Sequence, residues 1–245
     1  MEINYRVKLI TSIKDKDLSK ALDIYIHSVD EQSETSTSEI RAYIQNKYKE
    51  KRIMFFYILY VDNNVIGYAE YAYLPNTSVL FIDYLCTNPR NHTFFYNFYH
   101  MIFDDITERL QKKNLYIKYI VTELSLKKNN SDEYIDKDSN YFRQLLTMEN
   151  FRILKAPYYQ PLFNNSKTNI ALEFNIAIKP LINGIFSNTN LNKDFYLELV
   201  QEIYIEHYAT WYEHFYDKNI VEENISQLFI KIKSEFPKMI VVDDI

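Results

Sequence analysis

Apolar and polar residues are spaced regularly along most of this chain, and the period changes several times between that of a strand and that of a helix. Val79–Cys86 has the length and the β-branched and aromatic content of a buried strand. The run ends before Pro89, which lacks the amide hydrogen that a strand ladder needs. From Thr93 to Leu110, apolar side chains recur at helical spacing. This segment therefore predicts a buried strand, a short turn and a long amphipathic helix.

The residues before this segment predict one strand, two helices and two further strands. Residues 5–10 alternate as a short strand. Asp17 is a suitable N-cap for a first helix, and Glu39–Lys51 has the apolar spacing of a second one. Met54–Val61 and Val65–Tyr73 have the pattern of apolar strands separated by a polar turn. Because the link to the next strand is also short, we expect these three strands to form an antiparallel meander.

The residues after the long helix predict more strands and then only helices. Tyr116–Leu124 has the pattern of another buried strand, and its place after a strand and a helix favours a parallel crossover. Lys127–Asn140 is a charged insertion, which we expect to be solvated and mobile. The other expected elements are a helix at Tyr141–Met148, a final strand at Ile170–Ile178, and, beyond Pro180, amphipathic helices at Leu191–Phe215 and Val221–Phe236.

The composition argues against several classes of protein. The chain has 245 residues, of which 47% are hydrophobic and 25% charged, as in a globular protein. Its net charge of −5 argues against a general nucleic-acid binder, which usually carries a basic stripe. Cys86 is the single cysteine, so an internal disulfide and a multi-cysteine zinc site are excluded. His207 and His214 lack a third metal ligand, and we expect no metal site.

No segment has the pattern of a signal peptide or of a membrane span. We therefore expect a cytoplasmic protein that does not bind a membrane.

The order of the expected elements resembles that of the GNAT superfamily of acyl-CoA N-acyltransferases. Local motifs agree with this likeness. Ile66–Ala69 looks like the third strand of that family, where a glycine follows an aliphatic residue, and Leu85–Arg90 looks like the fourth strand leading into the pyrophosphate loop. Met148–Phe151 resembles the end of the helix at which the family usually has a glycine followed by a phenylalanine.

The resemblance covers roughly Tyr5–Lys179 and implies the fold class. That class is mixed α/β, of α+β character, with a GNAT-type central mixed β-sheet flanked by helices and a C-terminal two-helix extension. We expect one acyltransferase-like domain at 1–179, and an extension at 180–245 that packs on this domain or on a partner.

The resemblance also implies acetyl-CoA as a cosubstrate. In the family, backbone amides of an Arg/Gln-x-x-Gly-x-Gly/Ala loop wrap the pyrophosphate, because glycine lets the backbone approach phosphate closely. Here Arg90 matches the first position, while Thr93 and Phe95 stand where the glycines would be. Phe95 either obstructs a phosphate or points into the core from a shifted register. The residues carried over as cosubstrate-binding are Leu85, Cys86, Thr87, Arg90, Asn91, His92 and Thr93.

These positions also have a purely structural interpretation. The amides that open a long helix are free and positively polarised, which suits a phosphate beside Arg90. The same residues are equally well explained as a polar turn with a cap at Asn91 or Thr93. Leu85–Thr87 offers main-chain groups to a pantetheine arm if the neighbouring strand splays away, or is simply part of a central strand. Cys86 fits a small core residue better than a nucleophile, because no base lies near it in sequence.

Three carboxyl groups are candidates for acid/base work. Glu70, Asp83 and Glu123 lie inside apolar strands, where burial would raise a carboxyl pKa toward the range of a general base. Any one of them could deprotonate an amine directly or through water. Taken singly, each is also explained as an outward-facing strand residue. The tyrosine that the family often uses as general acid corresponds to Leu146 here.

Two functions follow from the resemblance and its departures. The first is an acetyl-CoA-dependent N-acetyltransferase that moves an acetyl group to a primary amine of an unidentified small-molecule or protein acceptor. The second is a catalytically inactive GNAT-like protein that serves as a binding or interaction module, marked by the missing glycines. The aromatic residues of the first C-terminal helix indicate a packing surface, and a homodimer through the C-terminal helices is one use for it.

Overall fold

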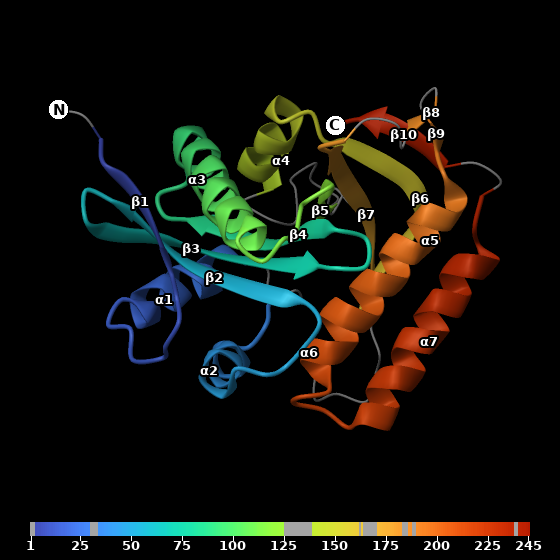
Figure 1. Cartoon of the computed structure of the whole chain (residues 1–245), viewed down its shortest axis with the longest axis horizontal. Coiled ribbons are helices and arrows are strands. Elements are labelled where there is room, and N and C mark those ends of the chain that lie inside the picture. The colour runs from blue at the N-terminus through green and yellow to red at the C-terminus, as the bar shows by residue number, and fades with distance from the viewer. Residues whose placement is uncertain are drawn as a thin grey trace, which may run out of the picture.

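One mixed β-sheet runs through the molecule (Figure 1). The computed structural model describes residues 3–29, 34–124, 139–161, 163, 171–182, 186–187, 190–237 and 240–245. Its strands are β1 (Tyr5–Leu9), β2 (Ile53–Val61), β3 (Asn64–Leu74), β4 (Val79–Thr87), β5 (Tyr119–Leu124), β6 (Arg152–Pro161), β7 (Ala171–Pro180), β8 (Phe186–Ser187), β9 (Asn190–Leu191) and β10 (Ile240–Asp244). They are ordered β1-β2-β3-β4-β5-β7-β6-β10-β9-β8. Only the β4–β5 pair of this described sheet is parallel, as the strand–helix–strand order predicted.

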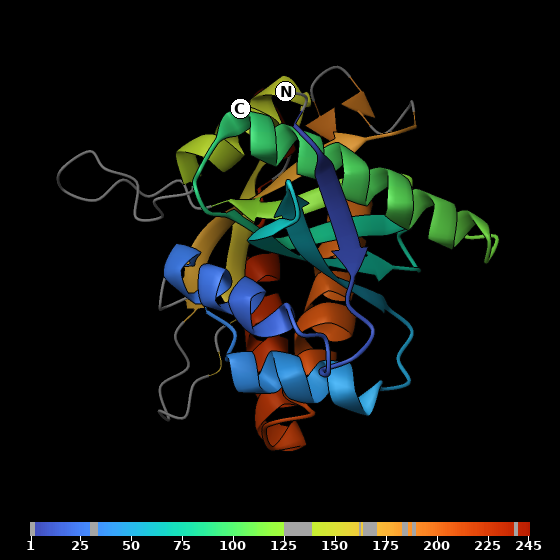
Figure 2. The ribbon, with the colours of Figure 1, turned by 90° about the vertical axis from the view of Figure 1, so that its left-hand side faces the viewer.

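Helices cover both faces of the sheet (Figure 2). They are α1 (Leu18–Ser28), α2 (Thr37–Asn46), α3 (His92–Gln111), α4 (Ser139–Met148), α5 (Lys193–Glu202), the π-helical segment η1 (Ile203–Ala209), α6 (Thr210–Tyr212) and α7 (Lys218–Ser234). One hydrophobic cluster joins α3 and α4 to one face. Two other clusters join α1, α2 and the C-terminal helices to the opposite face. The fold is therefore the predicted mixed sheet flanked by helices.

Helix α3 forms where the spacing predicted it, because its apolar stripe is buried and its start is capped. Phe95, Phe98, Ile102 and Ile106 are fully buried against the sheet. Asn91 Oδ1 accepts hydrogen bonds from the amides of Thr93 and Phe94, at 2.8 and 3.4 Å. Of the two predicted caps, the structure therefore uses Asn91.

The first two helices were predicted with errors at their ends. Helix α1 begins after Asp17, but the Asp17 side chain does not cap it and instead accepts a hydrogen bond from Tyr60 Oη at 2.9 Å. Helix α2 is capped by Ser36 and ends at Asn46 rather than at Lys51. It ends early because Lys47 adopts the left-handed conformation, which stops the helical hydrogen bonding.

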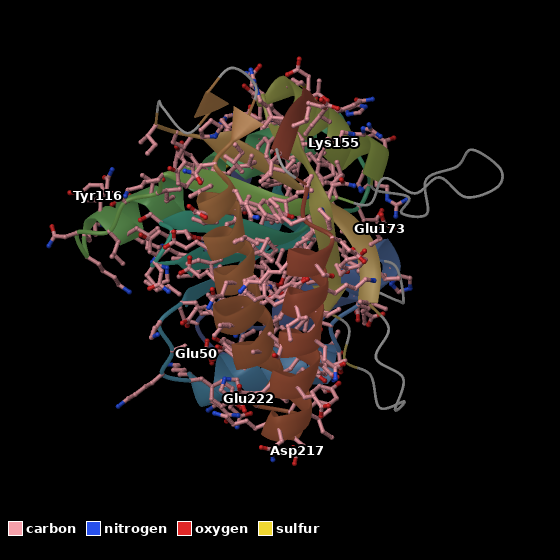
Figure 3. All side chains as sticks on the ribbon, turned by 90° about the vertical axis from the view of Figure 1, so that its right-hand side faces the viewer. Glu50, Tyr116, Lys155, Glu173, Asp217 and Glu222 are labelled. Atoms are coloured by element: carbon pink, nitrogen blue, oxygen red, sulfur yellow. The ribbon has the colours of Figure 1, made fainter. Side chains whose placement is uncertain are left out.

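The prediction that only helices follow Pro180 was wrong. The chain after Pro180 also contributes β8, β9 and β10, and β10 pairs with β6 in the main sheet. Helices α5–α6 and α7 lie side by side over the sheet (Figure 3). The extension thus completes the same sheet, while the division of the chain at residue 179 stays a prediction. The charged insertion expected at Lys127–Asn140 lies, apart from its last two residues, outside the described residues.

No helix in the described part of the chain is long and apolar enough to cross a membrane.

Candidate active site at the opening between two parallel strands

The two parallel strands separate partway along their length. Strands β4 and β5 pair only over Val79–Ile82 and Tyr119–Thr122. Beyond that point β4 continues to Thr87 paired with β3 alone, and β5 continues to Leu124 paired with β7 alone. The sheet therefore opens between the last residues of β4 and β5. Asp83 and Glu123 are the first residues of the two strands beyond the shared ladder.

A β-bulge in β4 determines where Asp83 points. Glu70 pairs with Tyr84 and Tyr71 pairs with Ile82, so Asp83 is the extra residue. Ile82 and Leu85 both pack in the cluster under α3. Asp83 contacts the C-terminal extension, and Tyr84 packs in the cluster with α1 and α2. The bulge thus puts two consecutive side chains, Asp83 and Tyr84, on the same face of the sheet.

Glu70 reaches this face through ordinary strand alternation. Its neighbours two residues away, Tyr68 and Ala72, pack in the clusters on the same face. Glu70 is 1% exposed and accepts a hydrogen bond from Tyr68 Oη at 2.8 Å. Burial raises the pKa of Glu70 well above its usual value, and the nearby charge of Asp83 raises it further. Both effects favour the protonated form of the Glu70 carboxyl group.

Glu123 accepts hydrogen bonds from three side chains. Tyr208 Oη donates to it at 2.7 and 2.8 Å from its two oxygens, Gln160 Nε2 donates at 2.7 Å, and Tyr158 Oη donates as well. Burial raises the pKa of Glu123 and the charge of Asp83 adds to the rise, while the three donors oppose it. The pKa settles at about 7. Glu123 therefore exchanges a proton in the range that a general base requires.

Asp83 is held by a histidine from the C-terminal extension. His207 Nε2 lies 3.3 Å from Asp83 Oδ2. His207 Nδ1 lies 3.3 Å from Arg52 Nη1, which also donates to the carbonyl oxygen of His207. Because a guanidinium can only donate, Nδ1 must accept, which assigns His207 as a neutral imidazole with its proton on Nε2. The Nε2 side of the His207 ring therefore faces the Asp83 carboxylate.

Glu50 is the acidic partner of Arg52, on the side of Arg52 away from Asp83 and His207. It accepts hydrogen bonds from Arg52 Nε at 2.7 Å, from His214 Nε2 at 2.5 Å and from Tyr43 Oη. Burial pushes the pKa of Glu50 upward, but the charge of Arg52 and these hydrogen bonds outweigh burial and hold the pKa below its usual value. Glu50 lies beside the end of helix α6 (Figure 3). Buried charges thus join the extension to the segment between α2 and β2.

A small cavity lies among these groups. Its volume is about 20 Å³, which is room for one water-sized group. It is lined by two carboxyl groups, an amide, a histidine and several aromatic side chains, namely Thr35, Glu70, Asp83, Tyr84, Gln160, His207, Tyr208, Trp211 and Tyr212. Four of these residues come from the extension.

The predicted pantetheine residues lie at the opening, with their backbone groups facing alternate sides. The amide of Asn88 donates to the carbonyl oxygen of Ile66 in β3. Because backbone groups alternate along a strand, Cys86 also turns its backbone toward β3, and Leu85 and Thr87 turn theirs toward the opening. The side chain of Cys86 is buried in the core, as the structural interpretation predicted.

The predicted phosphate-binding turn follows β4. Asn91, His92 and Thr93 are exposed, and Arg90 is partly exposed. The Asn91 side chain already satisfies two of the first amides of α3. Phe95 is fully buried in the core, so it does not obstruct the turn. The register is therefore the one in which Phe95 points inward.

Sequence reasoning missed the contribution of the extension. The aromatic residues of its first helix were interpreted as a packing surface, and indeed Tyr208 packs in a core cluster. The same residue donates to Glu123, however, and Trp211 and Tyr212 line the cavity. No local pattern could have shown this, because the partners lie about 85 residues apart in the chain.

Leu146, at the position of the family's general acid, is buried in the core. No group of three metal-ligating side chains occurs in the described part of the chain.

The arrangement of one mixed sheet flanked by helices is similar to the fold of solved acetyltransferases. A protein from Bacteroides thetaiotaomicron described as a GNAT-family acetyltransferase matches with a TM-score of 0.51, at 15% identity, over 73% of this chain and 88% of that one. The chain therefore has the GNAT fold.

Two further solved structures match less well. Diaminobutyrate acetyltransferase from Paenibacillus lautus, in complex with its substrate L-2,4-diaminobutyric acid and coenzyme A, has a TM-score of 0.47 at 15% identity, over 76% of this chain and 99% of that one. A GNAT-family acetyltransferase from Elizabethkingia anophelis with acetyl-CoA bound has a TM-score of 0.42 at 15% identity, over 73% and 99%. No family model matches the sequence, and a search of curated proteins finds no match.

Proposed function

We propose that the protein is an acetyl-CoA-dependent N-acetyltransferase that acts on a primary amine. The observation that carries this proposal is the position of two carboxylates, Asp83 and Glu123, at the two edges of the β4–β5 opening of a GNAT fold. Glu123 has a pKa of about 7 there, which suits a group that takes a proton from an attacking amine.

The cosubstrate would lie in the opening and along the turn after β4. Backbone groups of Leu85 and Thr87 face the opening, and the buried Thr87 hydroxyl has no hydrogen-bond partner among the described residues. These groups suit the amide-rich pantetheine arm. Arg90 would bind the pyrophosphate as a charged donor, with His92 and Thr93 beside it.

The reaction joins an amine nitrogen to the acetyl carbonyl carbon. A neutral amine attacks this carbon while Glu123 takes a proton from the nitrogen, directly or through one water. The carbon–sulfur bond then breaks, and coenzyme A leaves as a thiolate that takes up a proton. A backbone amide of β4 would stabilise the developing oxyanion, and most of the rate enhancement would come from holding the two reactants together. The products are an N-acetylamine and coenzyme A.

A GNAT-like binding module without turnover is the second candidate. The capping of α3 by Asn91 favours it, because the amides that bind phosphate in the glycine-bearing loop are partly satisfied by the protein itself. Asn91 would have to release these amides for a phosphate to use them.

Calorimetry with acetyl-CoA tests the proposal. We expect binding to the full chain, and we expect Arg90→Ala to weaken it by about 1.5–3 kcal/mol, the range for a hydrogen bond to a charged group. Arg109→Ala, at the other end of α3, is the matched control and should bind like the wild type. No heat of binding at millimolar acetyl-CoA would contradict the enzyme and leave the binding module.

A further inference from the structure

The cavity beside Asp83 contains a buried acceptor without a donor. Gln160 is 8% exposed, and its Nε2 donates to Glu123 Oε2 at 2.7 Å and to Tyr208 Oη at 3.1 Å. A carboxylate accepts only, so it fixes the amide with its nitrogen toward Glu123. The other end of the amide, Oε1, is buried and has no hydrogen-bond partner among the described residues. Since Gln160 lines the cavity, a donor bound there would satisfy this oxygen.

The charges and rings around the cavity favour a cation. The Asp83 carboxylate lines it, and the Glu70 carboxyl group adds acceptor oxygens. Glu123 accepts hydrogen bonds from two other lining residues, Gln160 and Tyr208. Trp211, Tyr212 and Tyr84 add aromatic rings, whose faces attract a cation. The residues that line the cavity include no lysine or arginine. Arg52 is not among the lining residues. It contacts His207 and Glu50, and its buried Nη2 has no hydrogen-bond partner among the described residues.

We propose that this cavity binds the ammonium group of the acceptor, and that the acceptor is a primary alkylamine whose amine-bearing carbon carries no carboxylate. The inference rests on the proposed function, whose acceptor class it narrows. The volume of about 20 Å³ admits the –NH₃⁺ head, while the rest of the molecule extends beyond it. An α-amino acid would place its own carboxylate beside Asp83, with no lysine or arginine among the lining residues to pair with it, which selects against it.

The single tryptophan of the chain reports on this site directly, because Trp211 lines the cavity. The full chain is titrated with methylammonium chloride while Trp211 fluorescence is recorded, and sodium chloride at equal ionic strength corrects for salt. Glycine, which is methylammonium with a carboxylate on the same carbon, is the matched competitor. We expect a saturable change with methylammonium and none with glycine.

Two variants locate the binding. Gln160→Leu removes the unpartnered oxygen, and Asp83→Asn removes a charge with little change in shape. Each should weaken methylammonium binding by at least about fivefold, the effect of losing one hydrogen bond or charge contact. Gln227→Leu, at an exposed glutamine of α7, should bind like the wild type. If Gln160→Leu does not fold, the methylammonium affinity of Asp83→Asn alone tests the inference.

The inference is overturned if methylammonium gives no saturable change, if glycine binds as well, or if the folded variants bind like the wild type. Because the titration contains no acetyl-CoA, these outcomes do not depend on acetyl transfer. An enzyme that acetylates α-amino acids and ignores methylammonium would retain the proposed function and refute the inference.

Discussion

Glu123 shows how two opposing effects give a carboxyl group a useful pKa. Burial alone would keep it protonated at neutral pH, and three donors alone would keep it ionised. Burial outweighs the three donors, and the pKa is raised to about 7. One donor, Tyr208, belongs to the C-terminal extension, so the extension helps to set the protonation state of the candidate base.

Replacing Glu123 tests its role as base. Glu123→Gln keeps the shape and removes the proton acceptor, so kcat should fall by about 10²–10⁴-fold, the usual contribution of acid/base catalysis. Acetyl-CoA affinity by calorimetry should stay unchanged. Glu222→Gln, at an exposed glutamate of α7, is the control. A Glu123→Gln enzyme as active as this control would remove Glu123 from the mechanism.

The pH profile gives an independent test of the same residue. A base works when deprotonated, so kcat/KM should rise with pH and level off above an apparent pKa of about 7. Tyr208→Phe removes a donor that stabilises the carboxylate, which should move this rise to higher pH. A rise at unchanged pH in Tyr208→Phe would show that the titrating group is not Glu123.

At the scale of single elements, the regular segments could be predicted and the irregular ones could not. Runs of apolar, β-branched and aromatic residues located β2, β3 and β4, because these strands are buried on both faces. The bulge at Asp83 breaks the alternation of side chains along β4, and its place depends on the register with β3. The π-helical segment η1 is a second irregularity. Ile205 is its single exposed residue, so no apolar spacing in the sequence marks the wider π turn.

Strand β3 depends on a glycine where it meets β4. A Cβ on Gly67 would lie 2.2 Å from the carbonyl oxygen of Cys86 and 2.8 Å from a methyl of Leu59. Because the first contact is with backbone, Gly67→Ala must displace β4, and we expect a loss of about 1–3 kcal/mol in the free energy of unfolding. Urea denaturation measures it, with Asn64→Ala at the exposed start of β3 as control. Equal stability of the two variants would mean that β4 moves freely here.

At the scale of the whole molecule, the sequence predicted the GNAT fold but not how the chain after residue 179 joins it. Helical spacing showed that the extension has an apolar face, which must pack on something. It could not show that β10 would pair with β6, or that His207 would reach Asp83, because neither contact leaves a local pattern. The candidate carboxylates were found from their apolar surroundings, while their partners from the extension, His207 and Tyr208, were not.

The shared core predicts that the extension and the sheet unfold together. Leu199, Tyr204 and Ile240 are fully buried with Phe81 and Val121 of the sheet. Thermal unfolding followed by Trp211 fluorescence should therefore coincide with unfolding followed by far-UV circular dichroism. Leu199→Ala should lower both midpoints together, at a cost of about 2–5 kcal/mol. A separate, earlier transition of Trp211 would show that the extension is an independent unit.

Release of coenzyme A tests the central claim most directly. The full chain is incubated with acetyl-CoA and a primary alkylamine near pH 8, where Glu123 is ionised, and free thiol is measured with time. The account predicts amine-dependent release of coenzyme A by the wild type, equal amounts of N-acetylamine by mass spectrometry, and almost none of either from Glu123→Gln that still binds acetyl-CoA. Acetyl-CoA binding without any amine-dependent release, across alkylamines, amino acids and lysine peptides, would contradict it.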